Sequence, residues 1–186
     1  MLKAGVAICN LTPNGKTRLS GYPDPPDRSG LMAHDPLYGS AYYFENNGSR
    51  ALFFTCDLVS MSKDRANELR MLVEKHTGIP RGNVCVCCTH THSGPCTAGE
   101  SWGDFDKLGE IEPENNDRIR DLLLGAALEA VNNTFDAVLG WGSGICGKEK
   151  GVGGNRHDPE NGPCDPSVGV VAIKDKAGEL RGCMVN

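Results

Sequence analysis

Residues 51–88 read ALFFTCDLVSMSKDRANELRMLVEKHTGIPRGNVCVCC, and this stretch decides the fold. It opens with a continuous apolar run at 51–56 and closes with another at 84–88, and both runs are typical of buried strands. Between them Ser62 can cap a helix that runs to Thr77 and stops at Gly78. Two strands joined by one helix usually lie parallel, with a right-handed crossover. The stretch therefore predicts an α/β fold.

The rest of the chain adds strands and one more helix to this unit. Further strands are predicted at 6–11, 37–45, 138–146, 168–173 and 180–185. A helix over about 116–132 has the clearest 3.6-residue period in the chain, and Gly- and Pro-rich loops occupy 21–36 and 147–166. We expect a mixed β-sheet core with flanking helices, organised as a single domain over 1–186.

The composition excludes several classes of function. The chain has 19 Lys and Arg against 24 Asp and Glu, and it has no basic run that could track the phosphates of a nucleic acid. No stretch approaches the ~20 apolar residues that span a bilayer. The first residues contain no long apolar core or cleavage site, so a cytoplasmic location is expected. The sequence gives no signal for the oligomeric state.

The nine cysteines are interpreted as reduced and mostly buried thiols. Nine is an odd number, and disulfide frameworks are typical of small secreted chains. No Cys-x-x-Cys pair is present, which disfavours a structural zinc site. Cys85 and Cys87, two residues apart in a predicted strand, would direct both thiols to one face.

The candidate chemistry lies just after the second strand of the 51–88 unit, in THTHSGP at 89–95. His90 and His92 alternate, so in extended backbone both imidazoles would share a face. They could hold one metal ion together, or one could bind metal while the other moves protons. Asp57 follows the first strand, and parallel strands bring their carboxyl ends to one edge of a sheet. The alternative is that two solvated histidines simply end a strand.

Other candidates are weaker. Arg156 ends the glycine-rich loop GVGGNR, which lacks the Lys-Ser/Thr of a phosphate loop; this arginine either reaches into a pocket or lies at the surface. Ser93 stands beside His92, although a nucleophile needs its base opposite it in space. His76 is interpreted as structural, near a helix C-terminus. His34 and His157 are interpreted as solvated or turn-forming loop residues, and not as metal ligands.

The order of the motifs resembles the neutral, non-lysosomal ceramidase family and its shorter bacterial relatives. The motifs are GVAI (5–8), LTP (11–13), SGY (20–22), HDPLY (34–38), CDL (56–58), THTHSGP (89–95) and GNR (154–156). The resemblance spans nearly the whole chain, and THTHSGP is its most specific element. It implies the N-terminal part of a larger catalytic domain, in agreement with a last strand pattern that runs directly into Asn186.

The resemblance also implies roles for individual residues. His90 would be a Zn²⁺ ligand, His92 would lie beside the metal and act on the scissile amide, and Arg156 would hold the substrate near the metal. The family completes its zinc site with another His, a Glu and a Tyr from later sequence. The implied reaction is hydrolysis of an N-acyl amide by metal-bound water, as in sphingolipid metabolism, and the 186 residues alone are expected to be inactive.

Three departures from the family widen the substrate class. The chain has no export signal, Cys96 stands where ceramidases usually have glycine, and the segment 98–113 is acidic. A small soluble amide therefore fits the sequence as a substrate as well as a lipid amide such as ceramide does. Two other functions stay open: a non-catalytic ligand- or partner-binding domain on the same fold, and a Ser or Cys acyl hydrolase that uses His92 as its base.

Overall fold

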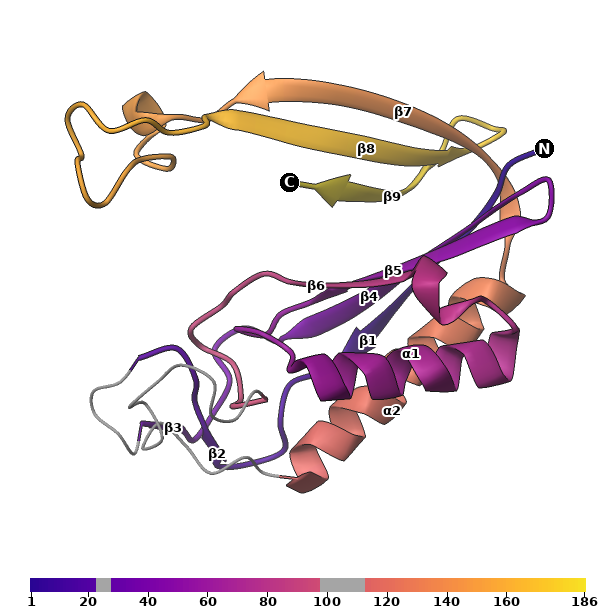
Figure 1. Cartoon of the computed structure of the whole chain (residues 1–186), viewed down its shortest axis with the longest axis horizontal. Helices are drawn as coiled ribbons and strands as arrows, with labels where there is room; N and C mark the ends of the chain where they lie inside the picture. The colour runs from indigo at the N-terminus through magenta and orange to yellow at the C-terminus, as the bar shows by residue number, and fades with distance from the viewer. Residues whose placement is uncertain (23–27, 98–112) are drawn as a thin grey trace. The chain divides into compact units, whose positions relative to one another are not determined.

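The computed structural model describes residues 1–22, 28–97 and 113–186, which form two compact units, 1–135 and 136–186 (Figure 1). The single-domain organisation over 1–186 that the sequence predicts stays a prediction. The first unit contains, in chain order, β1 (Lys3–Asn10), β2 (Thr17–Arg18), β3 (Ser29–Gly30), β4 (Tyr38–Asn46), β5 (Ser49–Cys56), α1 (Lys63–Thr77), the 3₁₀ turn η1 (Arg81–Asn83), β6 (Val84–Cys88) and α2 (Pro113–Asn132).

The central feature of the first unit is a mixed sheet in the order β6-β5-β4-β1. β5 and β6 pair in parallel, whereas β4 pairs antiparallel with both β5 and β1. Both helices lie on the same side of this sheet (Figure 1). The predicted α/β class and the strand–helix–strand unit over 51–88 are therefore confirmed.

The ends of α1 form as the sequence predicts. The Ser62 side chain accepts a hydrogen bond from the Arg65 backbone N–H at 3.3 Å, which satisfies one of the unpaired donors of the first turn. Gly78 adopts the left-handed conformation with φ 68°, and its N–H donates to the Glu74 carbonyl at 2.9 Å. A glycine takes this conformation without the Cβ clash that other residues meet.

The hydrophobic core lies between the sheet and the two helices. Strand alternation directs every second side chain to the helices, so one face of each strand is buried. The largest fully buried side chains of this core are Phe54, Leu11, Leu52, Leu58, Leu69, Ile79, Ile119, Leu123 and Val73. A Cβ atom on Gly5 would lie only 1.8 Å from the Ala130 carbonyl oxygen, so β1 and α2 pack with their backbones close together. Among the described residues, no helix is both long and apolar enough to cross a membrane.

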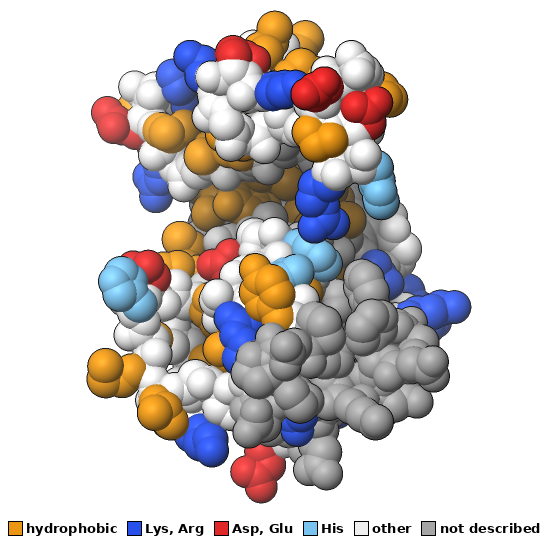
Figure 2. Space-filling view, turned by 90° about the vertical axis from the view of Figure 1, so that its left-hand side faces the viewer, with side chains coloured by type: hydrophobic (Ala, Val, Ile, Leu, Met, Phe, Trp, Pro, Cys, Tyr) orange, Lys and Arg blue, Asp and Glu red, His pale blue; other side chains and the backbone are white. Residues whose placement is uncertain are grey.

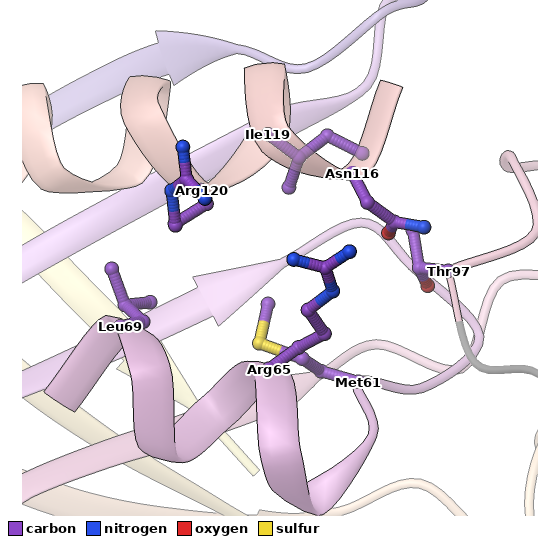
Figure 3. Close-up of a pocket in the computed structure, with 7 residues that line it drawn as sticks. All are labelled: Met61, Arg65, Leu69, Thr97, Asn116, Ile119 and Arg120. Carbon is purple, nitrogen blue, oxygen red and sulfur yellow. The ribbon is translucent and has the colours of Figure 1, made fainter. Parts of the chain in front are cut away.

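The two helices are joined at their exposed edge by a network of ion pairs. Arg65 contacts Glu68 and Asp117 at 3.0 and 3.1 Å, and Arg120 contacts the same two carboxylates at 2.8 and 3.1 Å. Figure 3 shows both arginines beside a small cavity of about 10 Å³, which has room for about one water molecule. The buried Asn116 Nδ2 lines this cavity and has no hydrogen-bond partner among the described residues.

The second unit is a three-stranded antiparallel sheet. It consists of β7 (Phe135–Ile145), the 3₁₀ turn η2 (Lys148–Lys150), β8 (Ser167–Asp175) and β9 (Leu180–Val185), with β8 paired to both neighbours. The predicted hairpin is confirmed: the Asp175 carboxylate accepts hydrogen bonds from the N–H groups of Ala177 and Glu179, and Gly178 takes φ 88°.

All nine cysteines are free thiols, as the sequence predicts, but the expectation that most are buried is wrong. Cys56 and Cys96 are buried, whereas Cys87, Cys164 and Cys183 are exposed. An apolar sequence run does not distinguish the two faces of a strand, and Cys87 lies on the face of β6 that does not join the core. The acidic segment expected over 98–113 lies, except for Pro113, outside the described residues.

Candidate active site

The candidate site starts where β5 and β6 end. Because these strands are parallel, both leave the sheet at the same edge, and the residues that follow them meet there. The Thr89 hydroxyl donates to Asp57 Oδ1 at 3.2 Å, and the Thr89 N–H donates to the Cys56 carbonyl at 3.0 Å. The other Asp57 oxygen, Oδ2, accepts from the Tyr38 N–H at 2.9 Å. The predicted meeting of Asp57 with the histidine segment is confirmed.

His90 does not continue the strand, so the prediction that His90 and His92 share one face of extended backbone is wrong. β6 ends at Cys88, and His90 takes φ 60°, in the left-handed region that few residues other than glycine adopt. Two hydrogen bonds hold this turn: the His90 N–H donates to the Leu58 carbonyl at 3.0 Å, and ring atom Nδ1 lies 2.7 Å from the Val59 carbonyl oxygen. The segment that follows β5 thus holds His90 in a strained backbone conformation.

The two imidazoles nevertheless lie together. The ring centroids of His90 and His92 are 4.9 Å apart, with an angle of 70° between the ring planes. The left-handed turn at His90, rather than a shared strand face, produces this pairing. His90 is exposed and His92 is half-buried. Figure 2 shows histidine side chains, in pale blue, at the surface.

His92 is positioned by an N-terminal segment that the sequence reasoning did not assign to the site. The Tyr22 ring meets the His92 ring edge to face, with centroids 4.8 Å apart. Arg28 lies over the Tyr22 ring at 4.7 Å and donates from Nη1 to the His92 carbonyl at 2.8 Å. In the sequence, Tyr22 is recognised only as part of the SGY motif. The sequence does not predict Arg28 as a site residue, because no local pattern links it to a residue 64 positions away.

This N-terminal segment is fixed by backbone pairing with the end of the histidine motif. The Ser20 N–H donates to the Gly94 carbonyl at 3.0 Å, and the Cys96 N–H donates to the Arg18 carbonyl at 3.1 Å. Gly21 then turns with φ 104°, and a Cβ atom there would lie 2.4 Å from His92 Cγ. Only glycine lets the backbone approach the imidazole this closely. Gly21 is the one local signal that could have indicated the contact.

A cavity of about 420 Å³ opens beside the histidine motif. Thr91, Ser93 and Pro95 form one side of it, and apolar side chains that include Leu19 and Leu37 form another. The cavity is therefore partly apolar, with hydroxyl groups near the histidines. His34 and Asp35 also line it, but their hydrogen-bonded side chains are almost fully exposed at 96% and 87%.

Arg156 belongs to the second unit, so its role in holding the substrate near a metal stays a prediction. It is exposed in the loop between η2 and β8. The neighbouring Asn155 organises this loop: its Oδ1 accepts from the N–H groups of His157 and Asp158 at 2.9 and 3.1 Å, and its Nδ2 donates to the Pro163 carbonyl. The loop thus has a defined turn, with Arg156 on its surface.

His90 has the features of a single metal ligand. A carbonyl oxygen only accepts hydrogen bonds, so the contact with Val59 places a proton on Nδ1, and Nε2 is then the ring nitrogen that could bind a metal. Metal-binding histidines usually donate their second nitrogen to a carbonyl or carboxylate in this way. Within residues 1–22, 28–97 and 113–186, no group of three or more His, Cys, Asp or Glu could hold a metal ion.

Comparison with known proteins identifies the fold. No family model and no curated protein matches the sequence. Among solved structures, the chain is similar to neutral ceramidase from Pseudomonas aeruginosa, with a TM-score of 0.84 and 21% identity over 99% of this chain and 31% of that one. A ceramidase complexed with C2 gives the same TM-score and identity over 99% of this chain and 30% of the other. The resemblance found in the sequence is confirmed as a likeness of fold, and the chain spans about a third of these ceramidase chains.

Proposed function

We propose that this chain is the part of a zinc-dependent amide hydrolase of the neutral-ceramidase type that carries the first metal ligand and the catalytic imidazole. The proposal rests on the fold similarity to ceramidases and on the histidine geometry. The single observation that carries it is the hydrogen bond from His90 Nδ1 to the Val59 carbonyl, because it prepares Nε2 of an exposed imidazole for a metal.

In the proposed reaction, His90 would hold Zn²⁺ through Nε2. The ion would supply Lewis-acid chemistry, activating water and polarising the amide carbonyl. His92, with its ring centroid 4.9 Å from that of His90, is close enough to donate a hydrogen bond to the oxygen on which negative charge develops. Tyr22 and Arg28 are positioning residues in this scheme, since they hold the ring and the backbone of His92.

Arg156 is proposed to bind the substrate rather than to transfer protons. A guanidinium stays charged at every physiological pH and presents several N–H donors to a carbonyl or hydroxyl oxygen. Its loop is turned by Asn155, so the arginine is presented at the surface.

The proposed substrate class is N-acyl amides, with ceramide and smaller soluble amides both included. The cavity beside Thr91 and Ser93 has an apolar side that suits an acyl group, and its hydroxyl groups suit the polar end of an amide. We propose that the 186 residues alone do not catalyse the reaction, since a catalytic zinc typically needs three protein ligands and His90 supplies one.

The proposal is tested on the 186-residue chain by nitrogen-15 NMR of the imidazoles. His90 should show the tautomer with its proton on Nδ1, and added Zn²⁺ should shift the Nε2 signal of His90 before those of His34 and His157. His90→Ala should abolish the strongest zinc effect, whereas His157→Ala, which changes an exposed loop histidine, should leave it intact.

Two results would overturn the proposal. The first is a His90 ring that carries its proton on Nε2 and does not respond to zinc while His34 does. The second is hydrolysis of an amide or ester by the chain that survives a chelator and is lost in Ser93→Ala, which would favour the acyl-hydrolase alternative.

A further inference from the structure

A second pair of metal-binding side chains lies on β6, outside the candidate active site. Cys85 and Cys87 are two residues apart on a regular strand, and their Sγ atoms lie 3.7 Å from each other. Cys87 is exposed and Cys85 is half-buried. The alternate residues Val84, Val86 and Cys88 pack with the core, so the two thiols occupy the opposite face of the strand.

Strand pairing fixes the Cα positions of the two cysteines without help from a ligand. β6 pairs in register with β5, where Phe53 lies opposite Cys85 and Thr55 lies opposite Cys87. Backbone pairing therefore fixes both Cα atoms, and only the side-chain rotamers remain free. Such a pair loses little conformational freedom when an ion binds, which favours affinity.

The distance between the sulfurs suits a metal ion better than a disulfide. Two thiolates on a tetrahedral ion with metal–sulfur bonds of about 2.3 Å lie about 3.8 Å apart, close to the 3.7 Å observed. A disulfide would need the sulfurs at about 2.05 Å. It would also join Cα atoms that extended backbone keeps about 6.6 Å apart, near the upper end of the disulfide range.

The chemistry of the pair selects soft cations. Burial raises the pKa of the Cys87 thiol, and the neighbouring Cys85 thiol raises it further, so the Cys87 thiol keeps its proton at neutral pH. A cation must therefore displace protons, and only thiophilic ions form bonds to sulfur strong enough to do so.

We propose that Cys85 and Cys87 form a two-thiolate site for a soft d¹⁰ cation of the Cu(I), Zn(II) or Cd(II) kind, separate from the His90 site. Binding forms two metal–sulfur bonds and releases two protons to solvent, with no change in oxidation state. Solvent or a small thiol would complete the coordination. The inference rests only on the β6 geometry, so it stands or falls independently of the amide-hydrolase proposal.

The test is a Cd²⁺ titration of the reduced full chain, followed by the ultraviolet thiolate-to-cadmium absorption band. Cys85→Ser and Cys87→Ser should each weaken the tightest cadmium site by at least about tenfold, since even outer-shell changes at metal sites cost about 10–100-fold. Cys164→Ser is the matched control, because it removes an exposed single thiol and should leave that site unchanged. His90→Ala should also leave it unchanged.

Equal cadmium affinity in the wild type and in Cys87→Ser overturns the proposal, as does an equal loss in Cys164→Ser. If a serine variant does not fold, phenylarsine oxide on the wild type replaces it. One arsenic atom bonds two thiols with release of one water, and mass spectrometry of peptides should place the bridge on Cys85 and Cys87. A bridge between other cysteines, or the absence of any bridge, refutes the site.

Discussion

The close approach of Gly21 to His92 gives the sharpest prediction for the candidate site. In Gly21→Ala the new methyl group would lie 2.4 Å from Cγ and 2.7 Å from Cβ of His92. These atoms are near the backbone, so rotation of the imidazole alone cannot relieve the overlap. The alanine must also adopt φ 104°, a conformation that L residues rarely take.

The expected loss of stability has two parts that a control can separate. Holding a non-glycine residue in such a conformation costs about 1–3 kcal/mol, and forcing an extra methyl group into a packed contact costs about 1–3 kcal/mol more. Gly15→Ala is the matched control, because Gly15 has φ 85° and no heavy atom lies within 4 Å of the position of its Cβ. The control bears only the first cost, so Gly21→Ala should lose about 1–3 kcal/mol more than Gly15→Ala.

Urea unfolding of both variants measures this difference, and proton NMR of the aromatic rings reports the position of His92. Gly21→Ala should move the ring signals of His92 and Tyr22, whose edge-to-face contact the methyl group disrupts. Equal stability of the two variants, together with unchanged ring signals, would refute the reasoning that Gly21 positions the imidazole.

Two further predictions concern the first unit. In Gly5→Ala the new Cβ would lie 1.8 Å from a backbone carbonyl oxygen of α2, so the free energy of unfolding in urea should fall by at least about 3 kcal/mol. In the control Gly125→Ala, where the Cβ meets open space, the free energy of unfolding should rise by about 0.5–1 kcal/mol. Equal effects of the two substitutions would contradict the close packing of β1 and α2. Burial alone would raise the pKa of the Glu68 carboxyl, but hydrogen bonds from Arg120 and Arg65 outweigh it and lower that pKa. A lowered folded-state pKa means that Glu68 stabilises the fold above its unfolded pKa of about 4.3 and loses this effect as the pH falls through its lower folded-state value. Unfolding free energies measured from pH 7 to pH 3 should therefore fall more steeply in the wild type than in Glu68→Gln, and parallel curves would contradict this.

The sequence predicted the elements that local rules govern. Ser62 and Gly78 mark the ends of α1 because capping depends on neighbouring backbone groups only. The parallel pairing of β5 and β6 follows from the single helix between them. The position of Asp57 beside the histidine segment then follows from that pairing, without any knowledge of the rest of the chain.

The sequence did not predict what distant segments impose on one another. His90 leaves extended backbone because the carbonyls of Leu58 and Val59 hold it, and nothing in THTHSGP announces that turn. Arg28 donates to the His92 carbonyl beside the antiparallel bridge between Leu19 and Pro95. No hydrophobic periodicity in the sequence indicates that these two segments pair. The exposure of Cys87 was likewise invisible, because a run of apolar residues does not show which side of a strand the helices cover.

The contact between Arg28 and His92 has a consequence for folding kinetics. It closes a loop of 64 residues, for which the length-dependent entropy is roughly 4 kcal/mol. The β4–β5 hairpin and helix α1, whose partners are near in sequence, can form before this loop closes. The surroundings of His92 are therefore expected to assemble after these elements and to open before them. Amide hydrogen exchange around residues 18–22 and 94–96 would then be faster than exchange in β4 and β5, even while the sheet stays intact.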